Sequence, residues 1–367
     1  STRVCPILRS SAPERRFGSC GRICAGRASM ARRPRVGRLS RRRPFVPARS
    51  IVVVRVQLRE QHAGVAELAE IADAQHAGAA QRGVEDVVGA AEAARLAEVV
   101  KLVSERIKGV APGQLSAYIE RDLIPRLHGF ELLMASYAMC HMKLDMILTR
   151  LGYKPSATPP RLGVYLTNSL EEGERVEQTL FGLSRAIANE AKAASDIKRQ
   201  TPIMCVIGNP PYSGHSSNKG AWIEGLMADY KVSPELKRPA QAKWLSDDYV
   251  KFVRFAEHMI EKNGEGVLGF ITNHGYLDNP TFLDMRQHLR QTFDRIYVLD
   301  LHGNAKKKDV SPDGSPDRNV FDIMQGVAII VAVKHRSDRR DDKPLATVYH
   351  GDLWGSRDSK YQNLWEG

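Results

Sequence analysis

Short apolar runs alternate with longer amphipathic stretches over most of the chain after residue 100. Runs of about five to eight Val, Ile, Leu and Phe residues are typical of buried strands. They predict strands at 128–133, 162–167, 203–208, 266–272, 296–301 and 326–333. Apolar residues spaced three or four apart predict helices from Leu96 to Gly109, before Pro125, up to Gly152, and over 174–198, 246–262 and 280–291. Strands separated by such helices indicate right-handed crossovers and a mostly parallel α/β sheet.

The first hundred residues follow a different pattern. Residues 1–50 are rich in Arg, Pro, Ser and Gly, which predicts a disordered leader. Residues 51–58 are the one good strand candidate before residue 100, and residues 62–94 form an Ala- and Gly-rich, weakly amphipathic stretch. Lysine is absent before Lys101 and ordinary in frequency after it. This change of composition marks a boundary near residue 95.

The net charge of +12 is confined to the leader. Residues 1–50 hold fourteen Arg and one acidic residue, so 40 basic and 41 acidic side chains remain for the rest of the chain. Charge balance therefore does not by itself predict that the body binds nucleic acid, and any contact with phosphate must come from a local patch. No run of eighteen apolar residues is present, so the sequence predicts no membrane span. The five cysteines match no zinc-ligand spacing, and Cys140 and Cys205 fall in an expected helix and strand as buried thiols, which indicates a cytoplasmic protein.

The strand at 203–208 ends in Asn209-Pro210-Pro211-Tyr212, the most informative stretch of the chain. Two successive prolines cannot donate to a sheet ladder, so the strand stops and presents Asn209 and Tyr212 at its carboxyl end. Open α/β sheets bind ligands at that end. The Asn209 amide oxygen and the Pro210 carbonyl suit an exocyclic amine on a planar ring, and Tyr212 offers a flat face to that ring. The alternative is an ordinary strand-to-loop turn, in which Asn and Pro are common.

With this motif the sequence resembles the amino-group DNA methyltransferases, specifically the adenine-N6 enzymes with Asn-Pro-Pro-Tyr. Residues 129–138 and 269–277 look like the methyltransferase portion of large single-polypeptide restriction–modification enzymes of the type ISP and IIG kinds, and the resemblance covers residues 96–367. It implies S-adenosyl-L-methionine as cofactor and double-stranded DNA as partner, with the target adenine flipped out of the duplex. It also implies a Rossmann-like sheet of seven strands with an antiparallel final strand, here 326–333.

On the cofactor side, the resemblance places Glu131 at the ribose hydroxyls and Asn168 at the adenine edge of S-adenosyl-L-methionine. Either side chain can instead cap a helix. The Gly-rich turn of the family, of the type Asp-Pro-x-x-Gly-x-Gly-x-Phe, should sit just before Leu96, where close passage of the backbone past the cofactor requires glycine. Residues 83–95 lack the paired glycines and the proline. The sequence therefore predicts impaired cofactor binding.

The strand that carries this turn, the first of the sheet, is accordingly expected to be degraded or missing. Residues 83–89 are favoured to fill its place in part, because residues 51–58 would leave a connection of about forty residues. A reading-frame error or a misjoined gene fragment ahead of Leu96 explains the composition change, and a genuine divergent replacement is the alternative.

On the substrate side, Tyr212 is expected to stack on the flipped base, with Phe321 on its other face or as an ordinary core residue. Residues 213–245 carry Lys219 and further Lys and Arg residues among aromatic side chains, Trp222, Tyr230 and Trp244, and can close over the base or the DNA backbone. His274 follows the strand at 266–272 and is expected to line the site. Lys306-Lys307-Lys308 lies in a loop at the same edge, where it faces phosphates or solvent.

Three segments are predicted: an aberrant leader at 1–95, a methyltransferase domain at 96–340, and the start of a target-recognition domain at 341–367. No stretch resembles the nuclease or helicase parts of such restriction enzymes. Asn-Pro-Pro-Tyr also occurs in methyltransferases that act on protein glutamine or on RNA, so these substrates remain alternatives. A catalytically inert fragment that binds DNA or a partner is a third one.

Overall fold

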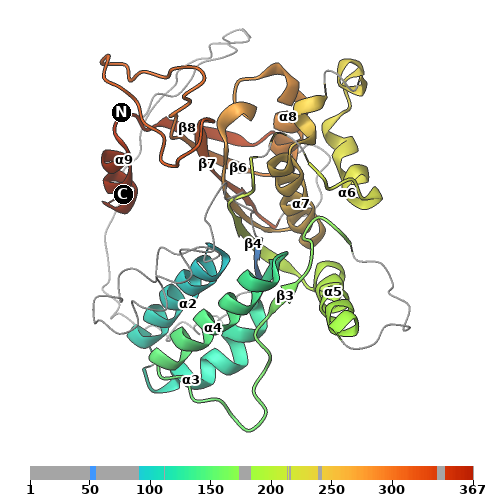
Figure 1. Cartoon of the computed structure of the whole chain (residues 1–367), viewed down its shortest axis with the longest axis vertical. Helices are drawn as coiled ribbons and strands as arrows, with labels where there is room; N and C mark the ends of the chain where they lie inside the picture. Colours follow the sequence, from blue (N-terminus) through green and yellow to red (C-terminus); the bar gives the residue numbers. More distant parts are fainter. Residues whose placement is uncertain are drawn as a thin grey trace, which may run out of the picture.

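The computed structural model describes residues 50–54, 91–110, 112–172, 183–212, 214, 216–238, 242–336 and 344–366. Within these residues one sheet runs through the middle of the molecule and helices cover both of its faces (Figure 1). No helix in these ranges is long and apolar enough to cross a membrane. The predicted leader at 1–49, the connection 55–90 and residues 173–182 lie outside the described residues.

The described strands form a single sheet in the order β3-β2-β1-β4-β5-β7-β6-β8. Their bounds are Ser50–Val54 (β1), Leu127–Glu131 (β2), Val164–Leu166 (β3), Ile203–Gly208 (β4), Gly266–Asn273 (β5), Arg295–Asp300 (β6), Val327–Lys334 (β7) and Thr347–Asp352 (β8). Strands β1 to β5 pair in parallel, and β7 is antiparallel to both β5 and β6. The mostly parallel α/β sheet and the antiparallel strand near residue 326 are confirmed.

Strand β1 occupies the centre of the sheet and corrects two predictions. It pairs with β2 on one side and β4 on the other, with Val53 opposite both Gly129 and Ile207. The first strand is therefore present, and the preference for residues 83–89 was wrong, because residues 50–54 supply the β-branched run that favours a strand in the middle of a sheet. Strand β1 ends at Val54 and the next described helix begins at Ala91, and the residues between them lie outside the described part of the chain.

Strand β8 corrects the expected count of seven strands. It pairs in parallel with β6 along its whole length, from Arg295 opposite Thr347 to Asp300 opposite Asp352. The rings of Tyr297 and Tyr349 stack across this pair with centroids 4.9 Å apart. Residues 347–352 thus extend the sheet, while the predicted domain boundaries near residues 95 and 340 remain predictions.

The two faces of the sheet carry separate cores, because neighbouring residues of a strand point to opposite sides. Leu127 of β2 packs with α2 (Ala91–Val110), α3 (Leu115–Tyr118) and α4 (Met134–Arg150). Phe130 of the same strand packs with the core beneath α5 (Leu183–Gln200), α7 (Asp248–Asn263) and α8 (Leu283–Thr292). The shorter helix α6 (Ala221–Leu226) contacts α7, and α9 (Arg357–Glu366) ends the described chain.

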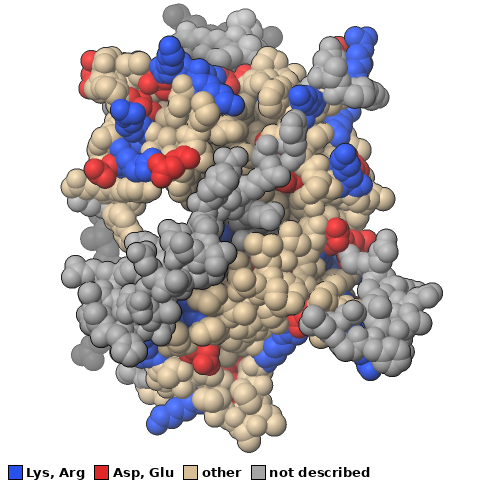
Figure 2. All heavy atoms as spheres, viewed as in Figure 1, with Lys and Arg blue, Asp and Glu red and all other residues tan. Residues whose placement is uncertain are grey.

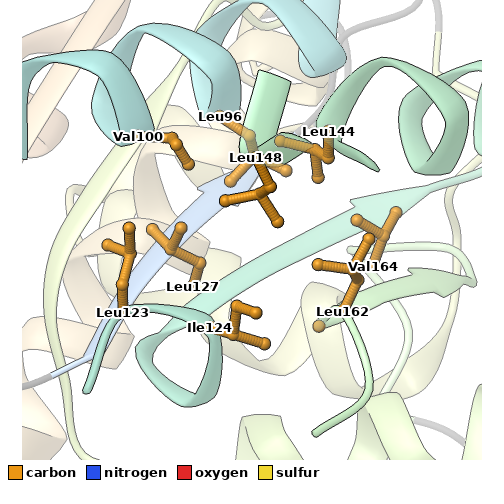
Figure 3. A pocket seen from close by; sticks show the side chains of 10 residues that line it. Leu96, Val100, Leu123, Ile124, Leu127, Leu144, Leu148, Leu162 and Val164 are labelled. Carbon is orange, nitrogen blue, oxygen red and sulfur yellow. The ribbon is translucent and has the colours of Figure 1, made fainter. Parts of the chain in front are cut away.

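An apolar pocket lies inside the core under α2 and α4 (Figure 3). Figure 3 shows the side chains of Leu96, Leu144 and Leu148 pointing from these helices toward Leu127 and Val164 of the sheet. Its lining contains no polar side chain. The pocket is a packing gap in the core, and it lies away from the carboxyl ends of the strands.

Candidate functional site

The carboxyl end of β4 places the Asn-Pro-Pro-Tyr motif in the middle of the sheet edge. Strand β4 ends at Gly208, as the two prolines predict, and lies between β1 and β5. Asn209 is only 8% exposed and Pro210 is buried. The two hydrogen-bond acceptors proposed for an amine, Asn209 Oδ1 and the Pro210 carbonyl, therefore belong to buried residues at the carboxyl end of β4.

Tyr212 turns back onto Asn209. Its hydroxyl donates a hydrogen bond to Asn209 Oδ1 at 2.9 Å. The ring meets Tyr249 of α7 edge-on, with centroids 6.2 Å apart. Burial raises the pKa of Tyr212 well above its ordinary value, so the hydroxyl stays protonated and remains a donor. Asn209 is thus fixed with its carbonyl oxygen as an acceptor, an interaction that the sequence did not reveal.

Glu131 lies at the end of β2, next to β1, where the resemblance places the ribose hydroxyls. The residue is fully buried, and its Oε1 accepts the backbone N–H of Leu133 at 2.7 Å. The carboxylate therefore also holds the chain as it leaves the strand. The role of Glu131 at the ribose hydroxyls stays a prediction.

Asn168 follows β3 and links two loops. Its Oδ1 accepts the N–H of Leu170 at 3.1 Å, and its Nδ2 donates to Glu171 at 2.9 Å and to Asn218 at 2.8 Å. The first bond closes a turn at residues 168–170, and it is not the helix cap considered from the sequence, because residues 169–172 are not helical. The bond to Asn218 connects the β3 edge to the segment after the motif.

Lys198 of α5 supports the turn that contains Asn168. Its ammonium donates to the carbonyls of Asn168 and Glu171 at 2.7 and 2.6 Å, and it lies 5.0 Å from the centroid of the Phe130 ring. Burial lowers the pKa of Lys198 to about 7, although Glu171 and Glu172 oppose the shift. Sequence reasoning missed this residue, whose only signal was its place in the last turn of an expected helix.

The segment after the motif is anchored to α7 by polar contacts. Asn218 Nδ2 donates to Asp248 at 2.8 Å, and the ammonium of Lys251 donates to the Asn218 carbonyl. Lys251 is 1% exposed and forms an ion pair with Glu224 at 2.6 Å. Lys219, next to this anchor, is exposed.

Two aromatic residues expected in a DNA-facing loop belong to the core instead. Trp222 meets Phe255 of α7 edge-on at 5.9 Å, and Tyr230 is fully buried with its hydroxyl donating to Glu257 at 2.7 Å. Trp244, by contrast, is 52% exposed. The expectation of an aromatic lid was therefore wrong for Trp222 and Tyr230, whose partners on α7 are invisible in a local sequence pattern.

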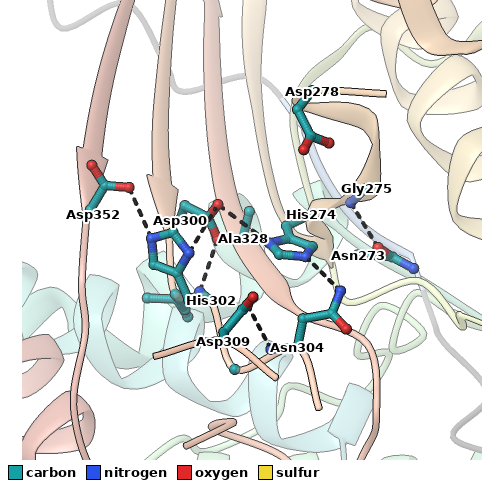
Figure 4. A network of polar contacts seen from close by, with 12 residues as sticks. Asn273, His274, Gly275, Asp278, Asp300, His302, Asn304, Asp309, Ala328 and Asp352 are labelled. Atoms are coloured by element: carbon teal, nitrogen blue, oxygen red, sulfur yellow. Dashed lines mark hydrogen bonds and ion pairs between the residues drawn. The ribbon is translucent and has the colours of Figure 1, made fainter. Parts of the chain in front are cut away.

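His274 is held in a polar network at the ends of β5 and β6 (Figure 4). Asn304 Oδ1 accepts the backbone N–H groups of Lys306 and Lys307, so its Nδ2 is the group that faces His274 Nε2 at 3.1 Å. Nε2 is then the acceptor, and Nδ1–H donates to Asp300 at 3.1 Å.

The same network continues from Asp300 to β8. Asp300 accepts the backbone N–H of His302 at 2.9 Å, and His302 Nε2 contacts Asp352 at 2.9 Å. The His302 ring stacks on the Trp354 ring, with ring centroids 3.3 Å apart. Burial raises the pKa of Asp300, but the hydrogen bonds from His274 and His302 outweigh it and hold that pKa below its usual range.

His274, Asp300 and His302 also bring one nitrogen or oxygen each within 4.8 Å of one another, as metal ligands would. His274 Nδ1 carries the proton in the hydrogen-bonded arrangement, so it is not free to ligate. The cluster is better described as a hydrogen-bonded support for the loop after β6. Gly326 permits it, because a Cβ there would lie 2.3 Å from the His274 ring.

Phe321 and Tyr212 meet at one small apolar cluster. Both rings pack against the buried side chains of Leu301, Val320 and Val327. Phe321 is half-buried, and its backbone N–H donates to Asn319 Oδ1 at 2.8 Å. The structure thus brings together Asn209, Tyr212 and Phe321, with His274 beside them, while Glu131 and Asn168 lie across β1 and β2.

Basic side chains near this edge do not form one continuous patch in the described residues. Lys306, Lys307 and Lys308 are exposed, and Lys307 already pairs with Asp278 at 3.2 Å. Figure 2 shows Lys and Arg scattered over the viewed face, several of them beside Asp or Glu. Contacts with phosphate would have to come from single residues of these loops.

Comparisons with known proteins agree with the motifs. Residues 154–306 match the model of the Eco57I restriction-modification methylase family. The ATP-dependent Type ISP restriction-modification enzyme LlaBIII bound to DNA is similar in structure, with a TM-score of 0.61 and 20% identity over 86% of this chain. DrdV, solved as a DNA complex, gives a TM-score of 0.53 and 22% identity over 71% of this chain. No curated protein matches.

The chain spans 18% of the length of LlaBIII and 24% of that of DrdV. At these identities the two structures show the fold alone. The matches confirm the resemblance drawn from the motifs: residues 154–306 carry the Eco57I restriction-modification methylase signature, and the chain is similar to the methyltransferase portion of a restriction–modification enzyme.

Proposed function

We propose that this chain is the adenine-N6 DNA methyltransferase module of a restriction–modification enzyme. The observation that carries the proposal is Asn209, buried at the carboxyl end of β4 and held by Tyr212 with its amide oxygen as acceptor. Adenine offers an exocyclic amine on a flat ring, which matches this acceptor and the adjacent aromatic face. The match of residues 154–306 to the Eco57I family supports DNA as the class of substrate.

Asn209 Oδ1 and the Pro210 carbonyl oxygen each accept a hydrogen bond from one N–H of the target amine. Both acceptors lie in a buried, preorganised position, where they stabilise positive charge as it develops on the nitrogen. The lone pair is then directed away from the ring, so the amine attacks without prior loss of a proton. Pro211 fixes the backbone between these acceptors and Tyr212.

The base reaches this position only after it leaves the duplex, at a cost of a few kcal/mol of unstacking. Tyr212 and Phe321, which share one apolar cluster, supply the two faces that replace stacking in the duplex. Lys219 contacts the DNA backbone from its exposed position. His274 supports the loop between β6 and β7, which carries Phe321 and the exposed lysines.

S-adenosyl-L-methionine supplies the methyl group when it is bound. Glu131, a buried carboxylate at the end of β2, suits the ribose hydroxyls, and Asn168 suits the adenine edge. The sequence after β1 reads Arg-Val-Gln-Leu and contains no glycine before Gly64, so the Gly-rich turn is missing from this position too. We therefore expect weak cofactor binding, and weak transfer, from the chain with this sequence.

Transfer of a labelled methyl group tests the function. Purified protein is incubated with labelled S-adenosyl-L-methionine at high concentration and with random-sequence duplex DNA, RNA or total protein. Label in N6-methyladenine of the DNA, absent with Asn209→Ala and present with Asn263→Ala, supports the proposal. Asn263 is a matched control because it lies at the amino end of β5, whereas Asn209 lies at the carboxyl end of β4.

Other outcomes separate the alternatives. Label in glutamine of protein or in RNA, with none in DNA, contradicts the proposed substrate and favours the corresponding methyltransferase. DNA binding without transfer of label at any cofactor concentration favours an inert binding fragment.

A further inference from the structure

The backbone that leads to Phe321 has no regular secondary structure, yet its carbonyl groups are paired. Buried carbonyls outside helices and sheets need partners from elsewhere. Three successive carbonyls ahead of Phe321 each accept a hydrogen bond from a side chain of α9. The contacts are Lys360 Nζ to Arg318 O at 2.7 Å, Arg357 Nε to Asn319 O at 2.9 Å and Tyr361 Oη to Val320 O at 2.6 Å.

Lys360 is the centre of this contact and is fully buried. A lysine ammonium has three hydrogens, and each finds an acceptor here. Besides the Arg318 carbonyl, they are the Leu301 carbonyl at the end of β6 and the Asp317 carboxylate, both at 2.7 Å. A charge enclosed in this way is costly to bury unless every donor is satisfied, so the geometry around Lys360 is strongly specified.

The other side of the segment is fixed by Asn319. Its Nδ2 donates to the carbonyls of Gly303 and Gln325, at 3.0 and 2.7 Å, while its Oδ1 receives the N–H of Phe321. A Cβ at Gly303, where φ is +78°, would lie 2.4 Å from the Asn319 backbone. The backbone at Gly303 and the backbone at Asn319 therefore approach as closely as glycine allows. The position of Phe321 therefore depends on contacts from both α9 and the loop after β6.

We propose that Lys360 and Tyr361 are positioning residues of the base-binding site, and that α9 is the template that sets Phe321 opposite Tyr212. This rests on the proposed function, because it assigns Phe321 to the face of a flipped base. Residues 357–361 then belong functionally to the methyltransferase site, although they lie beyond residue 340 in the segment predicted to begin a target-recognition domain. Neither side chain touches the base.

The test uses the full chain and duplex DNA of random sequence in which 2-aminopurine replaces part of the adenine. The fluorescence of 2-aminopurine rises when the base leaves the stack. Tyr361→Phe removes one hydroxyl from a side chain that is 40% exposed and leaves the fold intact. Lys360→Met is the stronger variant. Phe321→Ala removes the ring that forms one wall of the proposed base site, and Trp365→Ala, at a side chain 88% exposed on the same helix, is the control.

If α9 acts through Phe321, then Phe321→Ala and Lys360→Met each weaken apparent affinity in this assay about tenfold, and Tyr361→Phe weakens it about threefold. The double variant Lys360→Met/Phe321→Ala is then no weaker than Phe321→Ala alone, because the wall that Lys360 positions is already gone. A purely structural role predicts the product of the two losses instead. Trp365→Ala leaves affinity unchanged.

Two results would overturn the inference, and they differ in what they say of the function. If Phe321→Ala loses affinity while Lys360→Met and Tyr361→Phe stay within a factor of 1.5 of wild type, α9 does not position the wall, and the proposed function stands. If Phe321→Ala and Tyr212→Ala both equal wild type, no base occupies this place, and the proposed function fails with the inference.

Discussion

A histidine in the cofactor half of the molecule, around β2 and β3, and one in the substrate half, around α7 and α8, have pKa values shifted in opposite directions. On the cofactor side, His128 of β2 is 4% exposed, and neither ring nitrogen has a hydrogen-bond partner within the described residues. Burial lowers its pKa to about 4. On the substrate side, His288 of α8 donates from Nδ1 to the Glu257 carboxylate at 3.0 Å, and this contact outweighs burial and raises the pKa of His288.

The same contrast extends to the other buried polar groups. The hydroxyl of Ser104 on α2 and the Nε2 of His141 on α4 are also buried without a hydrogen-bond partner in the described part of the chain, and the apolar pocket of Figure 3 lies under the same two helices. On the substrate side, Lys251, Arg254 and Lys360 are buried cations, each paired with carboxylates. Buried polar groups stabilise a unique arrangement only when they are fully satisfied. We infer that the paired cations preorganise the substrate half, although Ser311 Oγ and Asp317 Oδ2 in that half are also buried without a partner among the described residues.

The largest expected effect is in the substrate half, at Arg254. This residue is 4% exposed and bridges Asp229 at 2.6 Å, Glu261 at 2.9 Å and Glu257 at 3.5 Å. Arg254→Met should lower the free energy of unfolding by about 3–5 kcal/mol, because it removes a buried cation and leaves the buried Glu257 carboxylate with only Tyr230 and His288 as partners in the described ranges. Urea denaturation measures it, with exposed Arg290→Met as control. A loss below about 1 kcal/mol would mean that this network does not preorganise the half.

The second effect is catalytic. Asn209→Ala removes one acceptor from the target amine, and groups of this kind are worth about 10²–10³ in rate, or roughly 3–4 kcal/mol. The melting temperature should stay near that of wild type, since Asn209 lies at the edge of the core. Single-turnover methyl transfer to DNA measures the rate. Activity retained within about fivefold would remove Asn209 from the chemistry.

The outcome of the sequence predictions follows the same division. Strand 203–208 and strand 266–272 were predicted to within one residue, because runs buried on both faces of a parallel sheet are continuous and apolar. The central strand was assigned to the wrong segment, since the length of a connection outweighed the better β-branched run. Lys360 could not be found at all: in sequence it is a lysine on a polar helix, and only the carbonyls of a distant loop show its role.

The third prediction concerns acid stability and isolates His128. Its pKa is about 4 in the folded chain against 6.5 in the unfolded one. Between these values the unfolded state binds a proton that the folded state does not, so stability falls as pH drops from 6.5 to 4. The total loss is on the order of 3 kcal/mol.

The variant His128→Leu should abolish that slope and raise stability at pH 7 by about 1–3 kcal/mol, because it also removes the unpartnered ring nitrogens. Exposed His335→Leu is the control. His288→Leu should do the reverse and destabilise most below pH 6.5, where the raised pKa of His288 keeps it charged beside Glu257. If His128 and His288 variants shift the pH dependence in the same direction, the contrast between the halves is wrong.

The smallest effect is at Tyr212, whose ring packs with both the main core and the cluster around Phe321. From the sequence, Tyr212→Phe should be mild, because only the ring face contacts the base. The structure adds a second role, since the hydroxyl donates to Asn209 Oδ1 at 2.9 Å and holds the acceptor in place. Loss of one such bond is worth about 1 kcal/mol, so we expect kcat to fall about fivefold while affinity for DNA changes little.

Tyr212→Ala should instead weaken the binding of the flipped base by about 1–3 kcal/mol. Single-turnover rates and 2-aminopurine titrations separate the two roles, with exposed Tyr349→Phe as the matched control. An unchanged kcat in Tyr212→Phe would show that the buried surroundings alone orient Asn209, and the substrate half would then be preorganised by packing rather than by this hydrogen bond.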